Sequence, residues 1–399
     1  MKKGWPIKRL AEISDKITDG SHNPPKGVPY SDYLMLSSKN VFDDDFHYEA
    51  PRYLTAEQFQ QEDKRTGISP GDVLLTIVGT IGRSAVVPPE APKITLQRSV
   101  AVIRPKRDII EPRFLMYSFI RRNVELNDQA RGVAQKGIYL EAIRELGLAV
   151  PPLPEQQRIV GILDEAFAGI ATAKANAEKN LQNARALFDS HLHSVFTQRG
   201  DGWKEKRLEE ICSFSSGGTP SKKKSSYWDG DIPWVSGRDM KSTRLSDSLL
   251  HISQSAVEDS STHIASAGTL LILVRGMGLA HGAQIAELMV PCAFNQDIRG
   301  IHPEPDLVPR YLLFALRDRI NSSDNVLSNA AHGTLKINSE ELKNLMIPVL
   351  TRSHQQEVVT TIDSLSEETQ RLEFISQQKL AALEALKKSL LHQAFTGNL

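Results

Sequence analysis

The chain has 399 residues, 40% of them hydrophobic and 24% charged, which is the composition of an ordinary folded protein with room for two or more domains. Lysine plus arginine and aspartate plus glutamate number 48 each, which excludes a uniformly basic protein and leaves any DNA affinity to local patches or a partner. No apolar stretch is long enough to span a membrane, and the first residues lack the apolar core of a signal peptide. Two cysteines also make no disulfide framework, so we expect a cytoplasmic protein in which Cys212 and Cys292 are buried free thiols.

The sequence contains an internal duplication. Residues 5–13, Trp-Pro-Ile-Lys-Arg-Leu-Ala-Glu-Ile, return as residues 203–211, Trp-Lys-Glu-Lys-Arg-Leu-Glu-Glu-Ile. Further matches follow in the same order: Gly71–Leu75 with Gly268–Ile272, Pro112–Leu115 with Pro309–Leu312, and Gln156-Gln157 with Gln355-Gln356. A duplicated chain predicts pseudo-twofold symmetry, and that symmetry suits a target with two half-sites.

Each copy opens with a globular part, at residues 1–152 and 201–350. Both parts are dense in glycine, proline and serine, and they contain short β-branched runs such as 73–78 and 270–274 that predict strands. Apolar patches after Pro112 and Pro309 predict a helix in each part. We therefore expect two repeated α+β domains.

Each copy closes with a long helix, at residues 153–200 and 351–399. Apolar residues recur there every three or four positions, at about the period of a straight helix, and each helix would be ~65 Å long at ~1.5 Å per residue. A helix with one apolar stripe needs a partner, and twofold symmetry makes the two helices antiparallel. The expected packing residues are Ile159, Leu163, Ile170, Leu181, Phe188 and Leu192 in the first helix, and Val358, Ile362, Leu365, Leu372, Leu383, Leu386 and Leu390 in the second.

Particular phrases of the chain resemble the specificity subunit of Type I restriction–modification systems. They are Asp19-Gly20-Ser21-His22-Asn23-Pro24, Gly217-Gly218-Thr219-Pro220-Ser221, Ile232-Pro233-Trp234-Val235, and the proline-rich helix entry Val150–Val160. The second helix entry, Ile347–Gln356, lacks the later prolines and the glutamate before the paired glutamines. Together with the duplication and the order of domains and helices, the resemblance covers essentially the whole chain.

The resemblance implies a DNA-reading scaffold without chemistry of its own. Each globular part would be a target-recognition domain that reads one half of a bipartite double-stranded DNA target, and the helices would set the distance between them. The implied partners are two modification (methyltransferase) subunits that carry S-adenosylmethionine, and restriction subunits that use ATP and Mg²⁺. No cofactor, metal or membrane is implied for this chain.

DNA reading needs cations for phosphates and amides or hydroxyls for base edges, placed on loops between strands. Positions that recur in both copies are the best candidates, although each alone could be a solvated charge or a turn former. Ser37–Asn40 matches Ser236–Asp239, Gln97-Arg98 matches Gln296-Asp297, and residues 135–139 lie near 332–336. The candidate DNA-binding residues are Ser38, Lys39, Asn40, Arg83, Gln97, Arg98, Lys136, Tyr139, Lys222, Lys223, Arg238, Lys241, Arg275, Gln296 and Lys336.

Two other classes of function remain to be compared. Asn23-Pro24-Pro25-Lys26 is similar to the catalytic motif of adenine methyltransferases, but Lys26 replaces its aromatic residue and no glycine-rich cofactor loop follows a strand, so a turn is the better interpretation. The sequence also has no phosphate-binding loop and no metal-ligand spacing. The other alternative is a coiled-coil adaptor whose end domains bind proteins, which the zero net charge leaves open.

Overall fold

The computed structural model describes residues 4–130, 137–197, 203–276, 278–279, 282–323, 326–329 and 335–399. The chain divides into two compact units: unit 1 contains Met1–Glu178 and Gln377–Leu399, and unit 2 contains Lys179–Ser376. Each unit holds one of the expected globular parts together with portions of both long helices.

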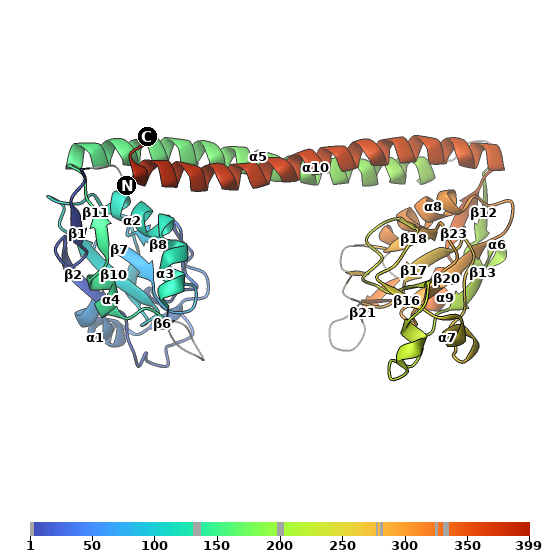
Figure 1. Ribbon diagram of the computed structural model, residues 1–399, viewed down its shortest axis with the longest axis horizontal. Coiled ribbons are helices and arrows are strands. Elements are labelled where there is room, and N and C mark those ends of the chain that lie inside the picture. Colours follow the sequence, from blue (N-terminus) through green and yellow to red (C-terminus); the bar gives the residue numbers. More distant parts are fainter. Residues whose placement is uncertain are drawn as a thin grey trace. The chain divides into compact units, whose positions relative to one another are not determined.

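Unit 1 is an α+β domain (Figure 1). Its strands are β1 (Ile7–Arg9), β2 (Ser14–Asp19), β3 (Tyr33–Leu36), β4 (Val41–Phe42), β5 (Asp45–Phe46), β6 (Arg52–Leu54), β7 (Val73–Thr76), β8 (Ser84–Val86), β9 (Lys93–Leu96), β10 (Val100–Pro105) and β11 (Gly147–Ala149). Its helices are α1 (Ala56–Thr66), α2 (Pro112–Arg121), α3 (Asn123–Gln129) and α4 (Leu140–Arg144), followed by the first part of α5 (Leu153–Thr197).

Unit 2 repeats this plan. Its strands are β12 (Lys204–Arg207), β13 (Cys212–Ser216), β14 (Ile232–Val235), β15 (Arg244–Leu245), β16 (Leu250–Ile252), β17 (Leu270–Leu273), β18 (Ile285–Leu288), β19 (Ala293–Phe294), β20 (Ile298–Pro303), β21 (Leu327–Asn329), β22 (Leu335–Ile337) and β23 (Met346–Val349). Its helices are α6 (Leu208–Ile211), the 3₁₀ turn η1 (Ser225–Trp228), α7 (Gln254–Glu258), α8 (Pro309–Asn321) and α9 (Ser339–Lys343), followed by the first part of α10 (Arg352–Thr396).

The sheets correspond in the two units. The main sheet has the order β2-β10-β7-β8 in unit 1 and β13-β20-β17-β18-β15 in unit 2. A smaller sheet, β6-β3-β9 or β16-β14-β19, has a central strand that pairs antiparallel with one neighbour and parallel with the other. Strand β7, predicted from the run at residues 73–78, is buried at all four positions, as is β17.

The repeated phrase Lys-Arg-Leu-x-Glu-Ile has a local structural reason. In unit 1 the backbone N–H and guanidinium of Arg9 both donate to the carboxylate of Glu12, and Arg207 repeats this with Glu210 in unit 2. The turn closed by these bonds directs Leu10 and the residue that follows the glutamate into the core, where Leu10 has no exposed surface. The arginine of this motif is therefore the last residue of the first strand in each unit, and the leucine and isoleucine that follow it are buried in the core.

The repeated glutamine pair fixes the start of each long helix. The Gln156 side chain has no exposed surface; its Oε1 accepts the backbone N–H of Glu111 at 2.8 Å, and its Nε2 donates to the carbonyls of Ile109 and Pro151. Gln355 makes the corresponding bonds to Val308 N–H and to the carbonyls of Asp306 and Leu350. Because a buried carboxamide that satisfies three backbone groups is costly to replace, this glutamine explains why the phrase survives in both copies.

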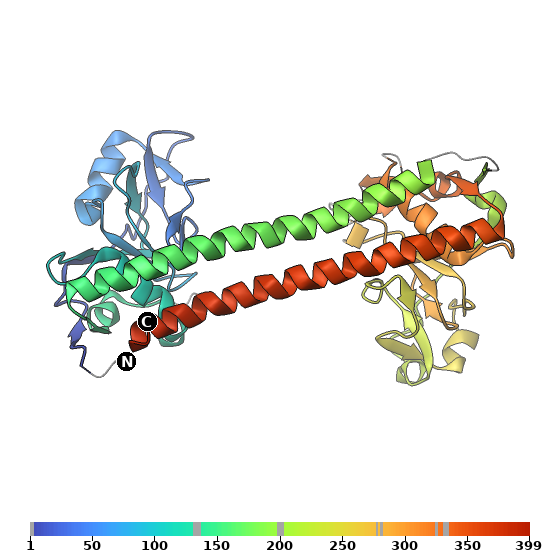
Figure 2. The same cartoon turned by 90° about the horizontal axis from the view of Figure 1, so that it is seen from above.

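The two long helices pack antiparallel within unit 1. Arg158 near the start of α5 donates to the carbonyl of Leu399, and Lys174 further along pairs with Glu384 at 3.0 Å, so the residue numbers rise along α5 while they fall along α10 (Figure 2). Within unit 2, Arg185 of α5 pairs with Glu373 of α10 at 2.9 Å. The two contacts in unit 1 agree with the expected antiparallel direction, and the contact in unit 2 shows that the two helices also meet there.

The apolar stripe of the first helix lies as expected, and that of the second differs. Ile159 and Leu163 join the core of unit 1, Phe188, Leu192 and Ile362 join the core of unit 2, and Ile170, Leu181, Val358, Leu365, Leu383 and Leu390 are partly buried. Leu372 and Leu386, however, are 49% and 46% exposed. The prediction that they pack was wrong. Near Leu372 the buried side of α10 passes through the polar residues Thr369 and Ser376, and near Leu386 the less exposed positions are Leu383, Lys387 and Leu390.

Candidate nucleic-acid interface

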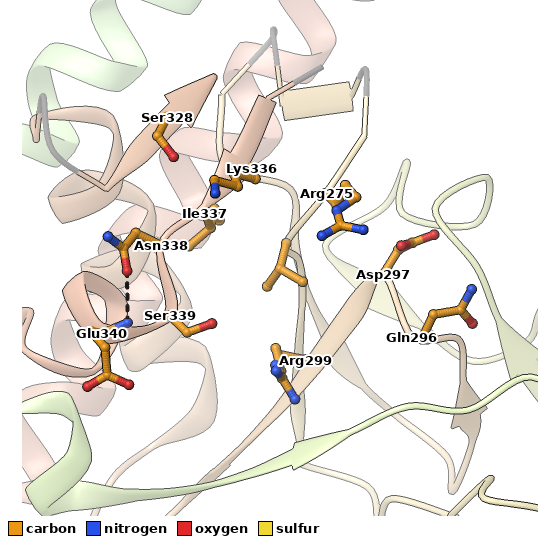
Figure 3. Close-up of a pocket in the computed structure, with 11 residues that line it drawn as sticks. Arg275, Gln296, Asp297, Arg299, Ser328, Lys336, Ile337, Asn338, Ser339 and Glu340 are labelled. Carbon is orange, nitrogen blue, oxygen red and sulfur yellow. Dashed lines mark hydrogen bonds between the residues drawn. The ribbon is translucent and has the colours of Figure 1, made fainter. Parts of the chain in front are cut away.

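Unit 2 carries a polar hollow of about 480 Å³ where its main sheet meets the β21–β22 hairpin (Figure 3). Three chain segments are tied together at its floor by backbone bonds. The N–H of Val274 donates to the carbonyl of Asp297 at 2.8 Å, and the carbonyl of Val274 accepts the N–H of Ile337 at 2.9 Å. The next residue, Arg275, forms an antiparallel bridge with Lys336.

The hollow brings together three of the candidates predicted from sequence. Arg275, Gln296 and Lys336 all line it and are exposed, and Asp297 and Arg299 line it beside them. In Figure 3 Arg275, Gln296 and Asp297 are drawn on one side and Asn338, Ser339 and Glu340 on the other. The hollow therefore offers charged donors, an amide and carboxylates on a rigid backbone, which is the equipment for reading polar groups.

The same backbone framework exists in unit 1. There the N–H of Ile77 donates to the carbonyl of Ser99, and the carbonyl of Ile77 accepts the N–H of Ile138, both at 2.9 Å. By this hydrogen-bond pattern Ile77 corresponds to Val274, Ser99 to Asp297 and Ile138 to Ile337. Equivalent hydrogen bonds thus define which residues correspond in the two units.

At the positions of Arg275, Lys336 and Arg299 unit 1 has no charged side chain. The bridge that joins Arg275 to Lys336 in unit 2 joins Val78 to Gly137 in unit 1. Arg299, which faces Ile272 in the main sheet, corresponds to Ala101, which faces Leu75 and is fully buried. The two units therefore share a scaffold and differ in the side chains that it presents.

This register corrects one predicted equivalence. The prediction paired Gln97-Arg98 with Gln296-Asp297, but the N–H of Gln97 donates to Leu36 as that of Asn295 donates to Val235, at 2.9 and 3.0 Å. Gln97 therefore corresponds to Asn295, and Arg98 to Gln296. The match of Gln97 with Gln296, based on residue identity, was one residue out of register. The backbone hydrogen bonds give the correct register.

Arg83 and Arg275 do not occupy equivalent positions in the two units. Arg83 hydrogen-bonds through its backbone to Thr76, one residue before Ile77, and its guanidinium lies over the ring of Phe42 at 4.6 Å. Arg83 is half-buried, whereas Arg98, Lys39 and Tyr139 of unit 1 are exposed, Tyr139 by 73%. Lys136 lies outside the described residues.

The predicted loop of Ser37–Asn40 is a capped turn rather than four reading residues. Asn40 is buried; its Oδ1 accepts the N–H of Ser37, and its Nδ2 donates to the carbonyls of His47 and Glu49. The prediction that Asn40 reads DNA was wrong, because its donors and acceptor are committed to its own loop. The backbone N–H of Ser38 donates to Ser99 Oγ, and Lys39 remains exposed.

Asp239 caps the corresponding turn of unit 2. Its Oδ2 accepts the N–H and hydroxyl of Ser236, both at 2.8 Å, and its Oδ1 accepts the N–H of Leu249. Arg238 occupies the place of Lys39 and is exposed, as is Lys241. Each unit thus has a similar turn that is capped by a polar side chain, and an exposed cation lies on that turn.

The three lysines at 222–224 differ in their contacts. Lys222 and Lys223 are exposed, whereas Lys224 pairs with Asp259 at 3.2 Å and lies over the Tyr227 ring at 4.0 Å. Lys224 therefore holds its own loop, and the first two lysines are the ones presented to solvent.

The methyltransferase-like phrase, residues 23–26, has no regular secondary structure. Arg52 donates from its guanidinium to the carbonyls of both Pro24 and Pro25, which occupies the carbonyl that such a motif would use to hold a base. Among the described residues no cluster of three or more histidine, cysteine, aspartate or glutamate side chains could hold a metal ion. In that same part of the chain no helix is long and apolar enough to cross a membrane.

Sequence reasoning missed Arg299 and named Asp297 only as a partner in an alignment. Arg299 is the second residue of β20, where the alternation of side chains along a strand would place it toward solvent. Its guanidinium donates a hydrogen bond to the Ser216 hydroxyl on the neighbouring strand β13. The available signal was an arginine between Ile298 and Gly300 in a strand that continues with the apolar Ile301.

Comparison with known proteins agrees with this architecture. The family described as Type I restriction modification DNA specificity domain matches twice, over residues 2–182 and 200–385. The chain belongs to this family. Each match covers one unit's globular part and extends into the long helix that follows it, so the family's repeat is the duplication seen in the sequence.

Among curated relatives of this specificity-domain family, the Type I restriction enzyme EcoR124I/EcoR124II specificity subunit of Escherichia coli is 30% identical over 226 residues. That alignment covers 55% of this chain and 55% of the relative, so the matched region spans about half of its length.

Two solved structures share the fold. A chain from a structure of complex assembly and conformational transition in a type I R-M system has a TM-score of 0.78 and 20% identity, covering 100% of this chain and 99% of that one. The HsdS subunit from Thermoanaerobacter tengcongensis has a TM-score of 0.55 and 20% identity, covering 100% and 98%.

Proposed function

We propose that the chain is the sequence-specific DNA-binding specificity subunit of a Type I restriction–modification complex, and that each unit reads one half of a bipartite target. One observation carries this proposal. The two units have the same backbone framework, fixed by Gln156 and Gln355 and by the capped turns, yet present different side chains at equivalent places. A duplicated scaffold with divergent presented groups suits two half-sites of different sequence.

The presented groups have the chemistry of DNA contacts. Lys39, Arg98, Arg238 and Lys336 are exposed cations on turns and strand ends, positions from which phosphates can be bound. The charge of the whole chain is zero, so these local groups supply the electrostatic attraction that its net charge does not. Binding is therefore expected to strengthen when partner subunits add their own contacts.

The proposed partners are two modification subunits that bind S-adenosylmethionine, and restriction subunits that use ATP and Mg²⁺. The chain itself is proposed to be non-catalytic and to act in the cytoplasm, where the host DNA lies. Support for a protein partner comes from α10 in unit 2, where Leu372, Phe374 and Ile375 are 49%, 58% and 50% exposed. Neighbouring exposed apolar side chains on one helix are typical of a protein interface.

A duplex-binding measurement separates this function from that of a coiled-coil protein adaptor. The full chain, alone and with the modification subunits of its host, is titrated with a pool of random-sequence duplexes and with single duplexes selected from that pool. We expect affinity that falls steeply with salt and differs between sequences. Equal affinity for selected and scrambled duplexes, or no duplex binding in either state, would contradict the proposal and favour the adaptor.

A further inference from the structure

We propose that the hollow of unit 2 reads a G·C base pair from the major groove, with the guanidinium of Arg275 donating to guanine and the carboxylate of Asp297 accepting from the cytosine amino group. The assignment deepens the proposed DNA-reading function and rests on it. It names a specific base pair for one unit and none for the equivalent place in the other.

The carboxylate of Asp297 lines the hollow. Within the described residues it has no ion pair or hydrogen-bond partner, although the Asp297 backbone is tightly held by Val274. A carboxylate only accepts hydrogen bonds and repels phosphate, so a hollow built to hold the DNA backbone would not present one. Cytosine, by contrast, offers an amino donor in the major groove that aspartate can accept.

Unit 1 has the same backbone framework without a carboxylate at the position of Asp297. Its equivalent there, Ser99, uses its hydroxyl to accept the backbone N–H of Ser38 at 3.0 Å, which is a structural contact. In unit 2 the residue that corresponds to Ser38 is Gly237, and no described contact links it to the Asp297 side chain. As far as the described residues go, the carboxylate is therefore available to a ligand that supplies a donor.

Arg275 supplies the complementary donors. Its side chain is exposed, lines the same hollow, and has no acceptor among the described residues, while its backbone is fixed by the bridge to Lys336. The two acceptors of guanine in the major groove, O6 and N7, match a guanidinium. One residue that donates and one that accepts, held on hydrogen-bonded neighbouring segments, thus match the two partners of a G·C pair.

The remaining cations have supporting roles. Lys336 is exposed at the rim, where an ammonium binds phosphate without base preference, and Arg299 is held by the Ser216 hydroxyl below. Unit 1 has Val78, Gly137 and Ala101 at the corresponding three places. The G·C reading is therefore expected from unit 2 alone.

The test selects duplexes from a random-sequence pool with the full chain and the modification subunits of its host, followed by sequencing. The wild-type chain is expected to enrich a motif in which one half-site has an invariant G·C pair. Arg275→Val, which installs the residue of unit 1, should reduce discrimination at that pair about ten- to hundredfold and leave the other half-site unchanged. Asp297→Asn should shift the preference toward adenine, because a carboxamide both accepts and donates.

Lys206→Ala is the control, because Lys206 is an exposed cation of β12 in unit 2 that does not line the hollow, and its loss should leave every base preference unchanged. Asp297→Ser, another unit 1 residue, checks that the hollow tolerates substitution, by thermal melting. A selected motif that neither Arg275→Val nor Asp297→Asn alters would overturn the assignment while leaving DNA reading intact. If the wild-type chain enriches no motif, the proposed function itself fails, and the assignment fails with it.

Discussion

The guanidinium of Arg310 donates two hydrogen bonds to Oδ1 of Asp363, at 3.0 and 2.9 Å, and so fastens α8 of unit 2 to α10. Arg113 and Asp164 repeat the contact in unit 1 at 3.1 and 2.9 Å. Each arginine follows the proline that begins its helix, so the repeated Pro-Arg phrase marks where the recognition domain attaches to the long helix. In unit 2 this ion pair holds the recognition domain against α10, the helix that is proposed to bind partners.

The anchor in unit 2 should contribute measurably to stability. Arg310 is 8% exposed, so Asp363→Ala leaves a buried guanidinium without its carboxylate, and we expect a loss of about 2–4 kcal/mol in the free energy of unfolding. Arg185→Ala removes an ion pair whose arginine is 57% exposed and should cost less than about 1 kcal/mol. Urea unfolding followed by circular dichroism measures both, and equal losses in the two variants would contradict the account.

The buried glutamine at each helix entry offers a closely matched pair of variants. Gln355→Met keeps the size of the side chain but leaves one backbone N–H and two carbonyls without partners, so we expect a loss of about 2–4 kcal/mol. Gln356→Met changes the exposed neighbour and should have little effect. Thermal melting of the two variants makes the comparison; a destabilised Gln356→Met with an unaffected Gln355→Met would refute the assigned roles.

Burial lowers the pKa of His302 below its ordinary value of about 6.5. In the unfolded chain this imidazole takes up a proton as the pH falls through about 6.5, whereas the folded chain resists protonation, so the unfolded state binds more protons. The free energy of unfolding should therefore decrease as the pH falls below about 6.5, until the lower folded pKa is passed.

His302→Gln should flatten this part of the pH dependence, because glutamine does not titrate. Urea unfolding at about pH 7.5 and about pH 5.5 measures the change, with His251→Gln as the control, since the His251 ring pairs with the exposed Asp247. An unchanged slope in His302→Gln would show that other groups cause it.

Both cysteines of unit 2 should be slow to react. Burial raises the pKa of Cys212 to about 12 and that of Cys292 to about 11, so almost no thiolate forms near neutral pH. We expect neither thiol to be alkylated by iodoacetamide in the folded chain and both to react in urea. Mass spectrometry counts the modified residues, and rapid labelling of the folded chain would be inconsistent with their burial.

The duplication and the long helices could be predicted from the sequence because they leave periodic signals. Ile159, Leu163 and Phe188 recur at helical spacing and are buried, as predicted. The stripe of the second helix was less predictable: its buried side includes Thr369 and Ser376, whose polarity hides them from a search for apolar residues, while the apolar Leu372 faces outward.

The candidate interface shows the same division. Arg275 and Lys336 could be found because they lie in segments that occur in both copies of the sequence, and a backbone bridge joins them in the structure. Asn40 looked like a reading residue because loop amides often bind bases, but only its hydrogen bonds reveal that it closes its own turn. Sequence gives the residue type on a loop, whereas the partner that a side chain already has comes from the fold.

The central claim, that the two units each read half of a bipartite target, is tested most directly by mapping methylated bases in the host genome. Genomes of the wild-type strain and of a strain lacking this chain are compared by single-molecule sequencing. We predict one methylated motif with two specified blocks separated by unspecified bases, absent from the deletion strain and restored by the chain. A methylation pattern that is identical in the two strains, or a restored motif with a single continuous block, would contradict the account.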